Sequence, residues 1–270
     1  MLRKFLPVFL FTLSIAGFSQ SRLGEVACVY VTSPNLDSSV ALYEKIGFPK
    51  IASNVIPVPW AQVSDGSLLI MMRKDTGSYV GLTYYANDVD KIAAQLEKEG
   101  IQFTRKPKDG DQIRRYYFKS PDGLNIMLAS NLGAFSRPTG ITMLDMGHED
   151  IKSAEKYPNK QCGVFGEFCH SVADLDKSIV YWKKLGFEVK TQMVSPYPWA
   201  ILSDGLMVIG LHQTEDFDFP AVTYFGIDNE KKVQQLKEKG ITNIKQAVLR
   251  NNIILTTWEG LHFFIFAMRM

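Results

Sequence analysis

The chain has 270 residues, of which 46% are hydrophobic and 21% charged, a composition typical of a globular protein with room for two domains. Its 30 basic residues nearly balance its 28 acidic ones, which argues against a nucleic-acid partner because such partners are held by an excess of Lys and Arg. Three cysteines without a CxxC spacing predict neither a zinc knuckle nor a thioredoxin-type motif.

Residues 1–19 have the pattern of a secretory signal. Arg3 and Lys4 precede an apolar run over residues 5–15, and the small residues Gly17 and Ser19 on either side of Phe18 suit cleavage after Ser19. An uncleaved anchor is the alternative, although the run is short for an ordinary membrane span. We therefore expect an exported protein, periplasmic or extracellular, that has no membrane association once the signal is removed.

Residues 24–130 alternate between strand-like and helix-like patterns. Strands are predicted at 26–32, 61–63, 68–73, 79–86, 114–119 and 124–129, and helices at 37–46 and 88–99. Both helices stop at a glycine, Gly47 or Gly100, which is the usual residue after a helix end. Turn sequences at 64–67 and 120–123 predict hairpins. The pattern indicates one α+β domain.

Residues 163–268 repeat this order. Strands are predicted at 165–172, 200–202, 206–212, 222–227, 253–257 and 261–267, and helices at 176–185 and 229–239. The phrases LDSSVALYEKIGF and LDKSIVYWKKLGF lie 139 residues apart, as do PWAQVSDG and PWAILSDG. Residues 131–162 form the expected linker. Each copy also repeats weakly within itself, so we expect four modules, two per domain.

The motif LDxSxxx(Y/W)xKxGF after a strand, with SPDG before a closing strand, resembles the vicinal oxygen chelate superfamily. This superfamily includes glyoxalase I, bleomycin- and fosfomycin-resistance proteins and extradiol dioxygenases. The resemblance covers residues 24–130 and 163–268, and it implies tandem glyoxalase-like domains built from four βαβββ modules, with sheets curled around cavities. It does not fix the chemistry, since the superfamily's functions are diverse.

The resemblance also implies four metal-ligand positions in each domain. They fall on Cys28, Met71, Gly81 and Met127 in the first domain, and on Glu167, Gly210, Ala221 and Phe264 in the second. A catalytic divalent ion needs several oxygen or nitrogen donors around it. Only Glu167, and less suitably Cys28, could supply one. We therefore expect no cofactor and no metal at the usual site, with Glu167 the only suitable ligand.

Mostly apolar side chains are expected to line both cavities, because residues two apart on a strand share a face. The candidate ligand-binding residues are Cys28, Tyr30, Trp60, Met71, Arg73 and Met127 in the first domain, and Cys169, Trp199 and Phe264 in the second. Such pockets are typical of small-molecule sites. The second is more polar, because Glu167, Cys169 and His212 share its face, whereas His170 points under the helices.

Several candidates also have a plainer interpretation. Glu167 could be a solvated residue at a strand edge, and His212, near a strand end, could be exposed. Cys28 could pack in the core, as could the two tryptophans that follow prolines. Export also allows a Cys162–Cys169 disulfide, with Cys169 as a small buried residue the alternative.

Three functions fit these patterns. The first is binding of a small, partly apolar molecule. The second is a lyase-, isomerase- or dioxygenase-type enzyme, related to the glyoxalases, in which Glu167 with His212 acts as base or metal ligand. The third is a structural or assembly protein whose cavities are filled by their own side chains. A monomer is expected, because duplication supplies within one chain the pairing that single-domain relatives obtain by dimerising.

Overall fold

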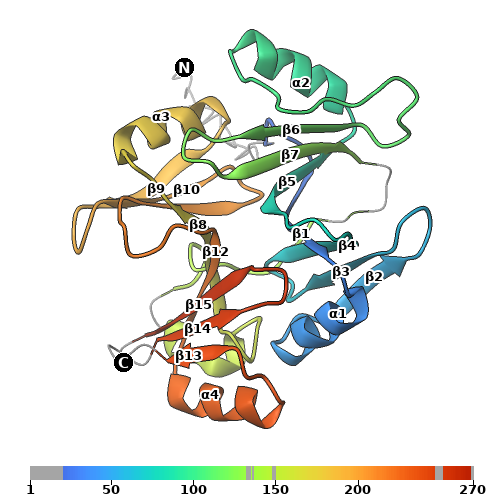
Figure 1. Ribbon diagram of the computed structural model, residues 1–270. Coiled ribbons are helices and arrows are strands. Elements are labelled where there is room, and N and C mark those ends of the chain that lie inside the picture. The colour runs from blue at the N-terminus through green and yellow to red at the C-terminus, as the bar shows by residue number, and fades with distance from the viewer. Residues whose placement is uncertain (1–20, 132–134, 136, 148–149, 247–251, 269–270) are drawn as a thin grey trace, which may run out of the picture.

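The computed structural model describes residues 21–131, 135, 137–147, 150–246 and 252–268 (Figure 1). The expected signal segment, residues 1–19, lies outside the described residues. Within the described ranges, no helix is both long enough and apolar enough to cross a membrane.

The first domain is a mixed sheet covered by two helices. Its strands are β1 (Val26–Ser33), β2 (Lys50–Asn54), β3 (Trp60–Ser64), β4 (Leu69–Lys74), β5 (Val80–Ala86), β6 (Arg115–Lys119) and β7 (Asn125–Ser130), and its helices are α1 (Leu36–Lys45) and α2 (Val89–Lys98). The strand order is β2-β3-β4-β1-β5-β7-β6. Because β1 pairs with β5 antiparallel and with β4 parallel, the two modules meet at the centre of the sheet.

The second domain repeats this plan. Short 3-10 helices at Asp150–Lys152 and Ala154–Lys156 precede β8 (Val164–Ser171), α3 (Leu175–Lys184), β9 (Glu188–Met193), β10 (Trp199–Ser203), β11 (Val208–His212), β12 (Ala221–Gly226), α4 (Asn229–Glu238), β13 (Ile244–Gln246), β14 (Ile253–Thr256) and β15 (His262–Ala267). The order is β13-β14-β15-β12-β8-β11-β10-β9, so β8 and β12 occupy the places of β1 and β5.

The predicted tandem α+β fold is confirmed, and the sheets are open rather than closed. Sequence patterns missed β2, β9 and β13. The first two are edge strands with mostly exposed side chains, which leave no apolar alternation to detect. In the second module of the first domain, an isolated bridge between Arg105 and Tyr117 stands where the other modules have a full strand.

Equivalent residues start the first helix of each domain. The side chain of Asn35 accepts a hydrogen bond from the backbone N–H of Ser38, and Asp174 does the same for Lys177. An acidic residue in the first turn and a lysine in the last turn complement the helix dipole. The repeated motif therefore encodes a capped helix that packs on the sheet of its own domain.

The helix-bearing faces of the two domains pack together into one core. Phe48 and Tyr43 contact Phe263 of the other domain, with ring centroids 5.7 and 6.2 Å apart. Figure 1 shows α2 near α3 and α1 near α4. The opposite face of each sheet is therefore left to form the pockets.

The repeated SDG turns lie in this interface. The hydroxyl of Tyr84 donates to Asp204 at 2.6 Å, and the hydroxyl of Tyr224 donates to Asp65. Each tyrosine reaches the turn of the other domain, so the two contacts are related by an approximate two-fold axis. Burial raises the pKa of Asp65, and hydrogen bonds from Tyr224 and from backbone N–H groups partly offset that rise.

Candidate functional site

The candidate site of the second domain begins with Glu167 on β8. Its side chain lies directly over Gly210 on the neighbouring strand β11. A Cβ atom at residue 210 would stand 2.0 Å from Oε2 of Glu167, so only glycine leaves room for this carboxylate. In the first domain the same two positions are held by Cys28 and Met71, which pack against each other in an apolar cluster.

The Glu167 carboxylate is buried, and the described residues supply hydrogen-bond partners to one of its two oxygens. Oε1 lies 3.0 Å from Nε2 of His212 and accepts a hydrogen bond from Thr223 Oγ1 at 3.3 Å. Oε2 has no partner among the described residues, although the side chain is only 5% exposed. A buried carboxylate oxygen without a donor is costly, which marks this atom as a point where a ligand can bind.

His212 is fixed on both sides of its ring. The hydroxyl of Tyr197 lies 3.3 Å from Nδ1, and the ring of Trp199 stacks at 6.4 Å between centroids. The side chain is 14% exposed, so the alternative of a solvent-exposed histidine is not what the structure shows. If Nε2 carries the proton toward Glu167, Nδ1 accepts from Tyr197, which gives a hydrogen-bonded Tyr–His–Glu chain.

Glu167 and His212 stand between two adjoining hollows. The larger, about 500 Å³, is lined chiefly by apolar side chains of the linker and sheet, among them Met143, Leu144, Trp199, Ile201, Phe225 and Phe266. The smaller, about 260 Å³, includes Cys169, Tyr197, Phe217, Phe219, Thr223 and Phe264. Few polar groups on apolar walls are typical of a small-molecule site.

Three potential metal donors meet at this place. One ligand atom from each of Glu167, Cys169 and His212 lies within 4.8 Å of the others. From the sequence, Glu167 is expected to be the only suitable metal ligand at a family position. In the structure, Cys169 and His212, which lie on the same face of the sheet, stand close enough to join it. Burial raises the pKa of the Cys169 thiol well above its ordinary value, so a metal there would have to displace a proton. With that proton lost, the oxygen, sulfur and nitrogen donors fit a three-ligand site.

The three cysteines are free and buried, so the structure shows no Cys162–Cys169 disulfide. His170 faces the helix layer as its position on the strand predicted, with its ring 6.0 Å from that of Trp182. Desolvation lowers the pKa of His170 to about 4. It therefore belongs to the core and not to the pocket.

The matching hollow of the first domain is filled. Phe135, from the linker, stacks on Tyr85 at 3.8 Å between ring centroids and also lies 6.3 Å from Trp60. Beneath it Cys28, Met71 and Met127 are buried in one apolar cluster. Of the residues expected to bind a ligand in this domain, only Tyr30 and Arg73 line a cavity on this face of the sheet. Trp60 also borders a surface depression near α1.

Sequence reasoning missed several residues of the second pocket. Thr223 lies two residues after Ala221 on the same strand face, so strand alternation could have identified it. Tyr197 lies in an irregular loop, and Met143 and Leu144 come from the linker. No periodic pattern marks these positions.

A family model described as the Glyoxalase/Bleomycin resistance protein/Dioxygenase superfamily matches residues 22–128. The first domain is therefore similar to this superfamily over the matched residues. The second domain repeats the same motifs and strand order. No curated protein sequence matches the chain.

Solved structures share the fold over nearly the whole chain. The Mn(II)-bound glyoxalase from Novosphingobium aromaticivorans is 16% identical, with a TM-score of 0.55 over 92% of this chain and 83% of its own. The 2,2',3-trihydroxybiphenyl 1,2-dioxygenase from Sphingomonas wittichii is 14% identical, with a TM-score of 0.54 over 93% and 91%. Homoprotocatechuate 2,3-dioxygenase from Arthrobacter globiformis is also 14% identical, with a TM-score of 0.57 over 91% and 80%. These likenesses concern the fold alone.

Proposed function

We propose that the second domain binds a small, largely apolar or aromatic molecule that carries a hydroxyl or N–H group. The observation that supports this is the Oε2 atom of Glu167, which is buried between two apolar hollows and has no donor in the described part of the chain. A ligand hydroxyl would supply the missing hydrogen bond, and the aromatic walls would bury the rest of the molecule.

Two of the structural neighbours suggest a chemical class to test. Their names give hydroxylated aromatic molecules, 2,2',3-trihydroxybiphenyl and homoprotocatechuate, as substrates. A phenol with a second apolar ring combines the two features that the pocket favours. We therefore choose 4-phenylphenol as the probe, and biphenyl as the matched compound without the hydroxyl.

The test is a titration that follows tryptophan fluorescence, since the Trp199 ring stacks on His212 in the site. We expect saturable binding of 4-phenylphenol and at least tenfold weaker binding of biphenyl. Glu167→Met removes both acceptor oxygens at similar length and should weaken 4-phenylphenol at least tenfold, as expected for a hydrogen bond to a charged group. Glu188→Gln, which removes an exposed carboxylate on β9, is the control and should change nothing.

Equal affinities for 4-phenylphenol and biphenyl would contradict the proposed hydrogen bond. The same conclusion would follow if Glu167→Met bound 4-phenylphenol as tightly as the unchanged protein.

An enzyme is the second candidate, and the Tyr197–His212–Glu167 chain favours it. A carboxylate that is held by a histidine beside an apolar pocket can accept a proton from a bound substrate, with Tyr197 and His212 orienting it. A divalent metal held by Glu167, Cys169 and His212 would supply Lewis-acid chemistry when bound. Elemental analysis of protein offered Zn²⁺, Ni²⁺, Mn²⁺ and Fe²⁺ tests the metal, and loss of bound metal in Cys169→Ser but not in Cys28→Ser would support it.

A further inference from the structure

The first domain has a cavity of its own, of about 400 Å³, at the end of the sheet face that Phe135 leaves uncovered. It occupies the place of the smaller hollow of the second domain. Arg73 lies two residues after Met71 on β4, as His212 lies two residues after Gly210 on β11, and both lie near the end of the strand that pairs with the domain's first strand. The chemistry at this shared place is different, since the cavity of the first domain is lined by cationic side chains.

Four basic residues line this cavity, Arg73, Arg105, Lys106 and Arg115, against two acidic ones, Asp75 and Asp111. Lys106 is paired with Glu97 outside the cavity. Asp111 accepts a hydrogen bond from the backbone N–H of Lys108. In the described part of the chain, Arg105 and Arg115 have no carboxylate partner. The cavity therefore carries a net positive charge.

The Arg73 side chain is held by one ion pair, but not all of its N–H groups have a hydrogen-bond partner among the described residues. Its Nη2 lies 3.0 Å from Oδ2 of Asp75, whereas its Nε is buried without a partner among the described residues. A planar guanidinium with a free N–H edge is suited to accept a second, bidentate anion. The carboxylate of Asp75 holds the side chain in place, and Arg73 is one of the residues that line the cavity.

Aromatic rings line the same cavity. Tyr30, Tyr79 and Tyr117 meet edge to face, with centroids 5.7 Å apart for the first two and 6.2 Å for the last two. The buried hydroxyl of Tyr79 has no partner within the described ranges, and the guanidinium of Arg105 lies 5.5 Å from the centre of the Tyr117 ring. Burial raises the pKa of Tyr30 to about 12, and the charges of Arg73 and Arg115 act against that rise.

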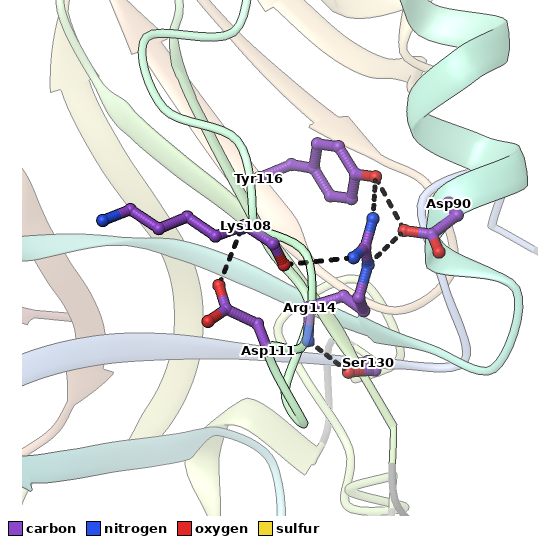
Figure 2. Close-up of polar contacts among 6 residues, drawn as sticks. All are labelled: Asp90, Lys108, Asp111, Arg114, Tyr116 and Ser130. Atoms are coloured by element: carbon purple, nitrogen blue, oxygen red, sulfur yellow. Dashed lines mark hydrogen bonds and ion pairs between the residues drawn. The ribbon is translucent and has the colours of Figure 1, made fainter.

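The loop that carries Arg105 and Lys106 continues to Lys108, whose carbonyl contacts the Arg114 side chain (Figure 2). Nε of Arg114 lies 3.0 Å from Asp90, Nη1 donates to the carbonyl of Lys108, and its backbone N–H donates to Ser130 Oγ at 2.9 Å. These contacts join the loop to α2 and β7. These contacts support the loop beside the cationic side chains, which should lower the entropic cost of ordering it when a ligand binds.

From this arrangement we infer a second ligand site in the first domain, for a small aromatic molecule bearing a carboxylate or phosphate group. The anionic group lies between Arg73 and Arg115, and the ring packs among the tyrosines. The site is separate from the pocket around Glu167, whose carboxylate would repel the same anion. The inference does not depend on the proposed function of the second domain.

The test uses benzoate and phenyl phosphate as probes and benzamide as the neutral match, measured by isothermal titration calorimetry on the full chain. We expect at least one anion to bind, and benzamide to bind at least tenfold more weakly. Arg73→Met and Arg115→Met should each weaken the anion by about tenfold to a hundredfold, as for loss of a charged hydrogen bond. Lys119→Met is the control, because it removes the same charge from β6 at an exposed position outside the cavity, and it should leave binding unchanged.

The relative affinities of benzoate and phenyl phosphate identify which anionic group the site prefers. The inference is overturned if neither anion binds at millimolar concentration, if benzamide binds equally, or if Arg115→Met and Lys119→Met have the same effect. His212→Phe keeps the test specific to the first domain, since anion binding that is lost in this variant would place the anion in the other pocket. Arg115→Lys, which keeps the charge, should retain part of the affinity if Arg115→Met is poorly folded.

Discussion

The two domains use one fold to build opposite interiors. At two equivalent positions on neighbouring central strands, the first domain has Cys28 and Met71 in one apolar cluster and the second has Glu167 over Gly210. In the first domain Phe135 then covers the apolar pair, whereas in the second the corresponding volume remains a pocket. A carboxylate buried at this position requires a glycine on the neighbouring strand. The pocket of the second domain therefore depends on two residues that differ together from the first domain, Glu167 in place of Cys28 and Gly210 in place of Met71.

The difference continues at the next cavity-facing position. Arg73 contributes to a cationic cavity in the first domain, and His212 joins a hydrogen-bonded chain with Glu167 in the second. The two cavities therefore differ in the charge of the side chains that line them. The predictions below test this contrast by making one domain resemble the other.

The largest expected effect concerns His170, whose equivalent in the first domain is the buried apolar residue Val31. The folded pKa of His170 is about 4, below its ordinary 6.5, so the unfolded chain binds the proton more readily. The free energy of unfolding should be fully maintained above pH 6.5 and fall by up to about 3 kcal/mol as the pH drops from 6.5 toward 4. His170→Val should remove this part of the slope in urea unfolding between pH 7 and 4.5.

The comparison is made between slopes because carboxylates that titrate in the same pH range affect both proteins equally. An unchanged slope in His170→Val would contradict the buried, uncharged histidine.

Gly210→Ala should reduce the affinity for 4-phenylphenol about a hundredfold, or about 2.7 kcal/mol. The new Cβ would stand 2.0 Å from Oε2 of Glu167 and would push the carboxylate away from His212. Met71→Ala, at the equivalent position in the first domain, is the matched control and should leave the affinity unchanged. Fluorescence titration of both variants measures the effect, and equal affinities would show that the carboxylate needs no such space.

Phe135→Ala should lower the free energy of unfolding by about 2 kcal/mol, because a half-buried stacked ring is lost. It should also leave an apolar hollow in the first domain that takes up biphenyl, seen as a second binding event in calorimetry. Ile141→Ala removes an exposed apolar residue from the same linker and should cost less than about 0.5 kcal/mol. No loss of stability in Phe135→Ala would show that the ring does not seal the first domain.

The smallest effects concern the interface. Tyr84→Phe and Tyr224→Phe should each lower the free energy of unfolding by about 1 kcal/mol, since each removes a hydrogen bond to a carboxylate in the other domain. Their effects should add, because the two contacts are separate. Tyr181→Phe loses only a 3.4 Å contact to a carbonyl and serves as the control. A loss of stability in only one of the two variants would show that the two symmetry-related hydrogen bonds do not contribute equally to the free energy of unfolding.

Much of the fold could be predicted because the information is local. Capped helices that end at glycines and alternating apolar strands repeat at a constant spacing, and strand alternation placed Arg73, Cys169 and His212 on the pocket faces. The resemblance located Glu167 by its place on the first strand of its domain. These features depend only on residues close together in the sequence.

Contacts between distant segments could not be predicted in this way. Phe135 enters the first domain from the linker, and Tyr224 reaches Asp65 across the interface. The cationic cavity combines Arg115 on a strand with Arg105 on a loop that Arg114 holds in place. Periodicity describes which face a residue occupies, but it carries no information about which distant segment packs there.

The most direct test of the contrast between the domains is a crystal structure of the protein with 4-phenylphenol. The account predicts one molecule in the second domain, with its hydroxyl oxygen about 2.5–3.0 Å from Oε2 of Glu167 and its rings between the aromatic walls. It also predicts no molecule between Phe135 and Tyr85. A ligand bound over Met71 and Met127 in the first domain, or one whose hydroxyl points away from Glu167, would contradict the account.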